Sequence, residues 1–346
     1  MLRAALVGTG YWGPNLANSI ERTGKAVLHW LCDADSNNLS SLARRYPSAR
    51  TTTDIGEVLG DERVDAVFIA TPTTTHYELG RRTLEACKHV LIEKPLATRS
   101  CDAEMLVGLA RERQRVLMVG HVFEYNAAVR FADDLIKSGE LGEIYYMSFE
   151  RTNLGPIRTD VSALWDLAAH DAAMMCDFMS AAPISVTARG QCYLNPGIED
   201  VVFATFLFEH GVAAHVHASW LNPKKVRQVT VVGSRKMAVC DDLDLRQPIR
   251  VYDKRVGLPP LSEITGSFLQ HKTLVVDGGA TIPVVQATEP LLTEVAHFLD
   301  CISSGKRPRT DGLSGWRVVR LLEAAADSIA RDSAIVPVNF RAMSAP

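Results

Sequence analysis

The chain has 346 residues, of which 47% are hydrophobic and 22% are charged, and its formal net charge is −3. This length exceeds the size at which a single hydrophobic core stops growing, so the sequence predicts two domains. The nearly balanced charge offers no basic surface for nucleic acid or an anionic membrane, and the composition excludes disordered, collagen-like and disulfide-scaffold proteins. We therefore expect a globular protein whose partner is a small molecule.

The seven cysteines are scattered, without a CxxC pair or a cluster with histidine, which indicates reduced thiols and no metal site. The apolar run Ala4–Val7 is too short for a signal-peptide core and continues directly into glycines. No apolar stretch reaches the length that spans a bilayer. The sequence therefore predicts a cytoplasmic protein with no membrane partner.

The first half of the chain alternates short apolar runs with helical patterns, which is typical of βαβ units and a parallel sheet. Several runs lack polar alternation, as expected for strands buried on both faces. The predicted strands are Leu2–Val7, Val27–Cys32, Ala66–Ala70, His89–Ile92 and Val116–Val119. The predicted helices are Pro14–Thr23, Leu39–Tyr46, His76–Ala86 and Cys101–Arg113, with Asp54 and Thr75 placed as helix caps. This order predicts a Rossmann domain with a doubly wound parallel sheet over residues 1–121.

After residue 121 the apolar runs become longer and alternate with polar residues, a pattern that favours antiparallel strands. The predicted strands are Glu143–Arg151, Ile184–Tyr193, Asp200–Phe208, Val212–Ser219 and Lys225–Val232, with a hairpin turn at Glu209-His210-Gly211. Helices are predicted over Glu289–Ser303 and Leu313–Arg331, packing back on the first domain, and a loop over Pro248–Pro283. The class predicted for residues 122–346 is an α+β domain with an open, mostly antiparallel sheet.

The first predicted strand ends in a glycine turn, Gly8-Thr9-Gly10-Tyr11-Trp12-Gly13, which opens the first helix. The first glycine permits a tight turn, the second lets the backbone approach a pyrophosphate, and the third allows close packing of helix on strand. Asp33 follows Gly13 by twenty residues, where a carboxylate accepts hydrogen bonds from the adenine ribose. It would repel a 2′-phosphate, so the motif predicts NAD in preference to NADP, bound also by Tyr11 and Trp12.

Two more features follow predicted strands, where open α/β sheets bind ligands. Thr71, Pro72 and His76 follow one strand, and Glu93 and Lys94 follow the next. We expect all five to line the cofactor site. A lysine beside a nicotinamide ring can also donate a hydrogen bond to a substrate oxygen and stabilise a developing alkoxide, which makes Lys94 a catalytic candidate.

In the second domain, Asp166 and His170 lie four residues apart, so on a helix they would share one face. A carboxylate and an imidazole that converge on one hydroxyl can perform acid/base chemistry, with His170 as the base. The alternative is a simple contact on a helix surface, and the role of Asp171 stays open.

Three further histidines lie in or after predicted strands. His121 follows a strand, while His215 and His217 could share one face of a sheet. No third ligand stands at a characteristic spacing, so cross-strand packing is favoured over a metal site.

The glycine turn, the Glu93-Lys94-Pro95 triplet and the Asp166-x-x-x-His170 pair together resemble the Gfo/Idh/MocA family of NAD(P)-dependent oxidoreductases. The resemblance includes Thr310-Asp311-Gly312 and spans nearly the whole chain. It implies a Rossmann domain followed by an open-sheet domain used for oligomerisation, and sugars, cyclitols or nucleotide sugars as substrates. It also implies that Lys94 is the catalytic or substrate-positioning lysine and that Asp166 and His170 are the acid/base pair.

The segment Asn153–Asp160 is similar to a subset of the family that includes sugar-nucleotide 3-dehydrogenases. It makes Asn153 and Arg158 candidate substrate-binding residues, alongside Asp166 and His170. Members of this subset often have proline where this chain has Ala169, which weakens the substrate inference.

The resulting hypothesis is an NAD-dependent homodimer or homotetramer that transfers hydride between nicotinamide and a ring carbon of a sugar, as in C3 oxidation of a nucleotide sugar. Three alternatives stay open: a keto-sugar reductase in deoxysugar or secondary-metabolite biosynthesis, a cyclitol dehydrogenase of the inositol type, and a non-catalytic dinucleotide sensor.

Overall fold

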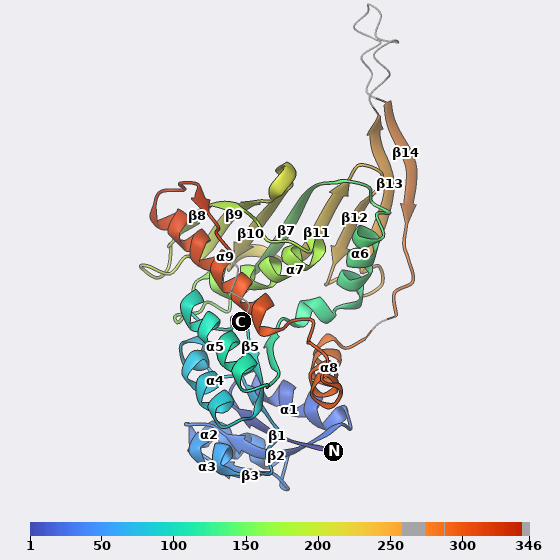
Figure 1. Ribbon diagram of the computed structural model, residues 1–346. Helices are drawn as coiled ribbons and strands as arrows, with labels where there is room; N and C mark the ends of the chain where they lie inside the picture. The colour runs from blue at the N-terminus through green and yellow to red at the C-terminus, as the bar shows by residue number, and fades with distance from the viewer. Residues whose placement is uncertain (258–273, 287, 341–346) are drawn as a thin grey trace, which may run out of the picture. The chain divides into compact units, whose positions relative to one another are not determined.

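A computed structural model describes residues 1–257, 274–286 and 288–340 (Figure 1). The chain divides into two compact units. The first contains Met1–Asn126, Thr288–Ala324 and, among the described residues, Phe340; the second contains Ala127–Ala287 and Ala325–Asn339. In the described part of the chain, no helix is both long and apolar enough to cross a membrane.

The first unit is built on a six-stranded parallel sheet in the order β3-β2-β1-β4-β5-β6. The strands are β1 Leu2–Val7, β2 Ala26–Cys32, β3 Arg50–Thr52, β4 Ala66–Ile69, β5 His89–Glu93 and β6 Leu117–Gly120. The helices are α1 Gly13–Arg22, α2 Ser36–Ala43, α3 Ile55–Gly60, α4 His76–Glu85, α5 Ser100–Glu112 and α8 Pro290–Ser304, joined by the first part of α9 Gly312–Ala330 and the short 3₁₀ turns η1 Thr73–Thr75 and η2 Val122–Tyr125. This is the doubly wound Rossmann order, in which the direction of winding reverses between β1 and β4.

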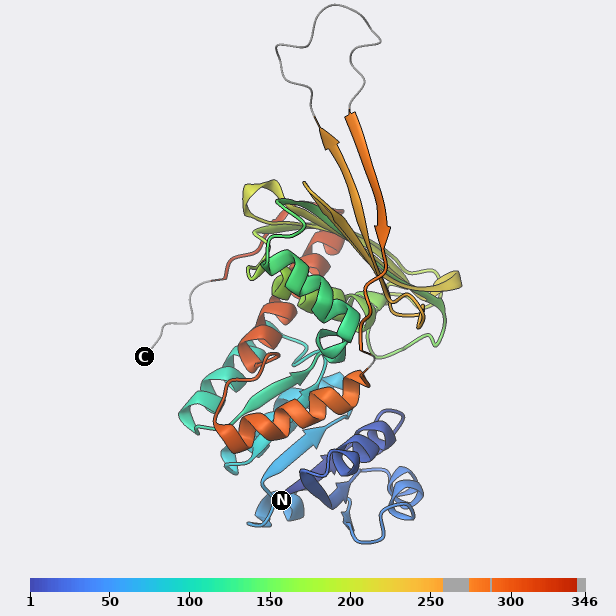
Figure 2. The same ribbon diagram turned by 90° about the vertical axis from the view of Figure 1, so that its right-hand side faces the viewer.

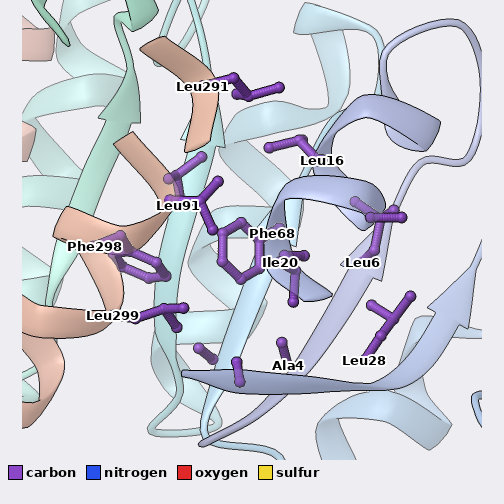
Figure 3. Close-up of a cluster of buried hydrophobic side chains, with 14 of the residues drawn as sticks. Ala4, Leu6, Leu16, Ile20, Leu28, Phe68, Leu91, Leu291, Phe298 and Leu299 are labelled. Carbon is purple, nitrogen blue, oxygen red and sulfur yellow. The ribbon is translucent and has the colours of Figure 1, made fainter. Parts of the chain in front are cut away.

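Apolar side chains from distant parts of the chain form the core of this unit (Figure 3). Phe68 of β4 lies between α1 and α8, and its ring meets Phe298 edge-on at 5.2 Å between centroids. Leu291, Val295 and Phe298 recur at helical spacing on α8 and are buried. The late helix α8 thus completes the core of the sheet formed by the first 120 residues.

Side-chain caps decide where two of the helices begin. The Oδ1 atom of Asp35 accepts the N–H of Asn37, so α2 begins at Ser36, three residues before the predicted start. Asp54 accepts the N–H of Gly56 and begins α3, so the predicted cap is confirmed, although this short helix was not among the predicted ones. Thr75 stands at the cap position of α4, but its hydroxyl donates to the carbonyl oxygen of Pro72, so the predicted side-chain cap is wrong.

The second unit carries a nine-stranded sheet in the order β14-β13-β12-β11-β7-β10-β9-β8-β15. The strands are β7 Ile144–Leu154, β8 Ser185–Gln191, β9 Val201–Leu207, β10 Ala213–Ser219, β11 Leu221–Gly233, β12 Met237–Asp241, β13 Ile249–Gly257, β14 Leu274–Thr281 and β15 Val336–Pro337. The helical elements within the unit are α6 Ala127–Lys137, a π-helical turn Leu164–Ala168, α7 Ala169–Met179 and the turn η4 Glu209–Gly211. The pairs are antiparallel except β7 with β10, which is parallel.

Helices α6 and α7 lie against one face of this sheet (Figures 1 and 2). Alternate side chains such as Met147 and Phe149 of β7 point to that face and are fully buried. On the opposite face, Tyr146 and Phe203 are each 47% exposed. The sheet is therefore open on one side, as its alternating sequence predicts.

The loop predicted over Pro248–Pro283 is wrong for the described residues of that range, because they include β13 and β14. Residues 258–273 lie outside the described part of the chain. The two strands form a ribbon at one end of the sheet, where Lys254 pairs with Asp277 across the strands at 3.0 Å. An edge ribbon buries little apolar surface, so its glycines and charges resemble a loop in the sequence.

Candidate functional site

The glycine turn after β1 has the three geometries that a dinucleotide site requires. Gly8 has a φ of +96°, and a Cβ there would lie 2.5 Å from the carbonyl oxygen of Ala70. A Cβ on Gly13 would overlap the carbonyl oxygen of Gly8, so only glycine lets α1 start this close to the strand. A Cβ on Gly10 would meet nothing nearer than the Asn38 side chain at 4.0 Å. Gly10 therefore leaves the open backbone that a pyrophosphate can approach.

Asp33, directly after β2, lies beside this turn. Its Oδ2 accepts the backbone N–H of Thr9 at 2.6 Å and the Thr9 hydroxyl at 2.9 Å, while Oδ1 accepts the N–H of Asp35. The carboxylate is thus fixed beside the glycine turn and partly exposed. A fixed carboxylate at this place accepts ribose hydroxyls and repels a 2′-phosphate.

Lys94 begins the loop after β5, next to a carboxylate that is tied to the glycine turn. The Trp12 indole N–H donates to Glu93 Oε1 at 2.7 Å, so the turn and the β5 loop are held together. Burial of the carboxyl group raises the pKa of Glu93 to about 7, against the opposing effects of the Trp12 hydrogen bond and the Lys94 charge. Tyr11, the neighbour of Trp12 in the glycine turn, is 94% exposed.

His76 holds the two ligand-side loops of the sheet to each other. Its Nδ1 lies 2.8 Å from the carbonyl oxygen of Pro95 and its Nε2 lies 2.9 Å from that of Thr71. The ring is buried, while Pro72 beside it is exposed. The geometry gives His76 a bracing role; its predicted contact with the dinucleotide stays a prediction, as does that of Thr71 and Pro72.

The residues after β4, β5 and the glycine turn fit a dinucleotide, because the open cradle at Gly10, the ribose-binding carboxylate of Asp33 and the cation of Lys94 share one edge of the sheet. A bound nicotinamide dinucleotide would supply a hydride donor or acceptor there.

Asp166 lies in the π-helical turn that precedes α7, in the second unit. Its Oδ1 accepts Arg158 Nη1 at 3.1 Å, and its Oδ2 accepts the indole N–H of the buried Trp220 at 3.4 Å. Arg158 also donates to Asp160, and these two carboxylates raise the pKa of the guanidinium. Asp166 is therefore oriented by two donors, as a residue that aims an imidazole or a substrate hydroxyl must be.

His170 stands in the first turn of α7, one turn after Asp166, and is buried. The next residue, Asp171, is 1% exposed and accepts Nε and Nη2 of Arg151 on β7 at 3.1 and 2.8 Å. Burial raises the pKa of Asp171, and the Arg151 charge opposes that shift. Asp171, whose role the sequence left open, thus forms a buried ion pair with Arg151 that fixes the start of α7 to the sheet.

Asn153, near the end of β7, donates from its amide to the carbonyl oxygen of Gly155. It shapes the loop that carries Arg158, and both are partly exposed. The site residues predicted from the sequence thus form two groups: the dinucleotide residues in the first unit, and Asn153, Arg158, Asp166 and His170 in the second.

Thr310-Asp311-Gly312 has a structural role that the sequence left unassigned. The Thr310 carbonyl oxygen accepts the N–H of Val119, and the Thr310 hydroxyl lies 3.1 Å from the Tyr125 hydroxyl. Asp311 accepts the N–H of Ser314, and this bond makes Asp311 the N-cap of α9. The segment therefore fixes the edge of β6, where the chain turns into the ligand side of the sheet.

The histidines of β10 pack across strands, as expected. His217 stacks on Phe203 of β9 at 4.5 Å between centroids, and His215 Nδ1 lies 3.2 Å from the Thr205 hydroxyl. Residues 1–257, 274–286 and 288–340 contain no group of histidine, cysteine, aspartate and glutamate side chains that could hold a metal ion.

Sequence reasoning missed three contacts of the site: Trp12 with Glu93, Asp166 with Trp220, and Arg151 with Asp171. Each joins residues between 20 and 81 positions apart. The residue types indicate only the contact of Arg151 with Asp171, because a buried aspartate requires a cation as partner.

Two family models match the chain. Residues 2–121 match the "Oxidoreductase family, NAD-binding Rossmann fold" and residues 129–239 match the "GFO/IDH/MocA C-terminal domain". Among characterised relatives, UDP-N-acetylglucosamine 3-dehydrogenase of Acidithiobacillus ferrooxidans is 25% identical over 92% of this chain and 94% of its own. The scyllo-inositol 2-dehydrogenase (NAD(+)) of Bacillus subtilis is 25% identical over 89% of this chain and 88% of its own.

Solved structures agree with this comparison. GenD2 from gentamicin A biosynthesis, solved in complex with NAD, superposes with a TM-score of 0.80 at 25% identity, covering 98% of this chain and 96% of its own. Both family models, the order of the strands and the geometry of the glycine turn lead to one assignment. The chain belongs to the Gfo/Idh/MocA family of NAD(P)-binding oxidoreductases.

Proposed function

We propose that this enzyme is an NAD-dependent dehydrogenase that transfers hydride between nicotinamide and a ring carbon of a sugar, most specifically the C3 carbon of a nucleotide sugar. The observation that carries the proposal is the tether between the glycine turn and the Lys94 loop, made by Trp12 and Glu93. It sets a cation beside the dinucleotide cradle. The likeness to UDP-N-acetylglucosamine 3-dehydrogenase supports the substrate class.

In the oxidation, the carbon–hydrogen bond of the substrate carbinol breaks and its electron pair leaves as hydride, while the hydroxyl proton passes to His170 Nε2 or Nδ1. Lys94 donates a hydrogen bond to the same oxygen and stabilises the charge that develops on it. Asp166, held by Arg158 and Trp220, orients the imidazole or a neighbouring hydroxyl. The reduction of a keto-sugar uses the same groups in reverse.

Asp33 supports NAD over NADP. Its carboxylate is fixed by Thr9 beside the turn, and the following residues, Ala34 and Asp35, offer no cation to a 2′-phosphate. The solved NAD complex of GenD2 agrees with this preference.

Arg158 and Asn153 support a substrate that carries a phosphate. Both are partly exposed, Asn153 at the end of β7 and Arg158 on the loop that precedes Asp166, and a guanidinium can pair with phosphate oxygens in a two-pronged geometry. The loop conformation is fixed locally by Asn153 and Gly155, so this contact would be preorganised.

The open face of the nine-stranded sheet supports a homodimer or homotetramer. Tyr146, Phe203 and Leu207 are 47%, 47% and 39% exposed there, and aromatic side chains are enriched in protein interfaces. All seven cysteines are free, which fits the cytoplasm as the compartment.

The test is a stopped assay of NADH formation and consumption with UDP- and dTDP-sugars, inositols and free sugars, on the wild type and on Lys94→Met and His170→Asn. We expect turnover with one nucleotide sugar and a loss of kcat of about 100-fold or more in both variants, with NADH affinity nearly unchanged. Lys306→Met and His210→Asn, both at exposed sites, are the matched controls.

Activity on an inositol alone would show that the substrate is a cyclitol and not a nucleotide sugar. Net reduction of a keto-sugar would show that the enzyme works as a reductase and not as a dehydrogenase. Dinucleotide binding without hydride exchange on any of these substrates would indicate a sensor. Normal turnover in both variants would refute the assigned roles of Lys94 and His170.

A further inference from the structure

Four large apolar side chains are exposed where two strands of the second unit end. Leu154 ends β7 and Ile157 follows it, while Tyr193 and Leu194 lie in the β8–β9 loop, residues 192–199. Tyr193 is 69% exposed and Leu154 is 74% exposed. Exposed apolar groups that gather at one place on a folded protein mark a binding surface. The chemistry proposed above uses none of the four.

The register of the sheet brings these side chains to the end that carries Asp166. Ser219, the last residue of β10, pairs with β7 and with Val201 of β9, and Gln191 of β8 pairs with the same valine. The chain therefore leaves β7, β8 and β10 at one end of the sheet. Asp166 lies at this end, because its Oδ2 accepts the indole N–H of Trp220, the residue after β10.

A buried carboxylate fixes the conformation of the β8–β9 loop. Asp200 is fully buried, and its Oδ2 accepts the N–H of Tyr193 at 2.6 Å and that of Leu194 at 2.9 Å. At the tip of the loop, the N–H of Ile198 donates to the carbonyl oxygen of Asn195. A tyrosine held on an ordered loop offers a large contact area at a small cost in conformational entropy.

The β8–β9 loop is also bonded to the segment that carries Asp166. The carbonyl oxygen of Glu199 accepts the N–H of Ala163 at 2.8 Å, directly before the π-helical turn. Asp166 in that turn accepts Arg158 at 3.1 Å. Neighbouring strands are about 4.8 Å apart, so β8 lies about 10 Å from β10, the strand that Trp220 follows. This separation is comparable with the length of a ribose and a diphosphate.

We propose that the β8–β9 loop binds the base of the nucleotide-sugar substrate, with the ring of Tyr193 stacked on the face of the base. The inference rests on the proposed function and names the group that recognises the nucleotide. Every base has a flat face that an aromatic side chain accepts. Arg158, bonded to Asp166, is the cation for the diphosphate between base and sugar. A second copy of the chain fits less well, because the reaction must leave Asp166 and Arg158 accessible.

The experiment measures the dissociation constants of UDP, dTDP and NADH by isothermal titration calorimetry, on the wild type, Tyr193→Ala and Tyr193→Phe. We expect Tyr193→Ala to weaken UDP or dTDP binding about tenfold and to change NADH binding by less than about twofold. Phenylalanine retains the ring, so Tyr193→Phe should bind the nucleotides as the wild type does. Tyr145→Ala, at a 55% exposed site near the opposite end of β7, is the matched control.

The thiol next to Tyr193 provides a readout that does not depend on a variant. Cys192 is free and exposed, so a bound base should slow its labelling by iodoacetamide. Cys101, an exposed thiol on α5 in the first unit, should be labelled at the same rate with and without UDP or dTDP. Mass spectrometry of the two peptides measures both rates.

The outcomes separate this inference from the proposed function. Nucleotide affinity that is equal in the wild type and Tyr193→Ala, or unprotected Cys192, would refute the inference alone. A wild type that binds NADH but no nucleotide or nucleotide sugar would refute it together with the nucleotide-sugar substrate. Because Tyr193 is exposed, Tyr193→Ala should unfold at the wild-type temperature. A lower unfolding temperature with equal loss of NADH and UDP affinity would show a role in the fold only, and a smaller mass in light scattering would show a contact between copies; either would overturn the proposal.

Discussion

The carboxylate of Asp33 accepts hydrogen bonds from both the N–H and the hydroxyl of Thr9. These two bonds hold its negative charge next to the glycine turn. An asparagine amide at this position could still accept these bonds but would carry no charge. We predict that Asp33→Asn weakens NAD binding about tenfold and leaves NADP binding unchanged or stronger, because the repulsion of the 2′-phosphate is removed.

Titration calorimetry with both dinucleotides checks this, with Asp102→Asn on the partly exposed side of α5 as the control. An unchanged ratio of NAD to NADP affinity would show that Asp33 does not select the cofactor.

A second prediction at this scale concerns Glu294 of α8, which is fully buried and whose carboxylate oxygens have no hydrogen-bond partner in the described part of the chain. Burial and the charges of Glu93 and Glu124 raise its pKa well above the usual value. A carboxyl whose folded pKa is raised stabilises the fold below its unfolded pKa of 4.5, and this contribution is lost as the pH rises toward the folded pKa.

The contribution of Glu294 to the free energy of unfolding should therefore decline as the pH rises from about 5 toward about 8, by up to about 1.4 kcal/mol per pH unit while the group stays protonated in the fold. Glu294→Gln should make that decline shallower. Urea denaturation at both pH values measures it, and the exposed Glu104→Gln is the control. Equal pH slopes in wild type and variant would contradict the burial argument.

At the scale of elements, the pair Arg151–Asp171 joins β7 to the start of α7, next to His170. Loss of one partner leaves the other charge buried and unbalanced. We predict that Arg151→Met destabilises the protein by about 3 to 5 kcal/mol, whereas Arg151→Met with Asp171→Leu recovers most of the loss. Without the guanidinium the pKa of Asp171 rises further, so the single variant should lose more stability at about pH 8 than at about pH 5.

Chemical denaturation of the four members of this double-mutant cycle provides the test. If the double variant is no more stable than Arg151→Met, the pair is not what holds α7 to the sheet.

The elements also show what the sequence could predict. Five of the six strands of the first unit were found because each is a mostly apolar run, and α8 because its apolar residues recur at helical spacing. The short strand β3, Arg50–Thr52, has no apolar residue and was missed. The ribbon of β13 and β14 was read as a loop because, apart from the buried Ile249 and Val251, those of its side chains that the structure describes are partly or fully exposed and leave no apolar pattern. The parallel pairing of β7 with β10 and the bond from Trp12 to Glu93 depend on distant parts of the chain, which local periodicity does not record.

At the scale of the whole molecule, the open face of the nine-stranded sheet should determine assembly. Phe203, on β9 beside His217, is 47% exposed. We predict that Phe203→Arg shifts the proposed dimer or tetramer toward the monomer, because a desolvated guanidinium without a partner costs several kcal/mol at an interface. Light scattering during size-exclusion chromatography measures the mass. Leu245→Arg, at a 90% exposed site outside the strands, should leave it unchanged; a monomeric wild type would remove the basis for this prediction.

The core of the nucleotide-binding unit includes Leu291, Val295 and Phe298, yet the strands and helices that they cover are finished by residue 126. During synthesis the ribosome must therefore add about 170 more residues, up to Phe298, before that core can close, an interval on the order of 9 to 34 seconds at about 5 to 20 residues per second. Throughout it, α8 is not yet available to pack against Phe68 and Leu16. The nascent chain is a natural client for chaperones, and a fragment that stops at residue 126 should aggregate and fail to bind NAD.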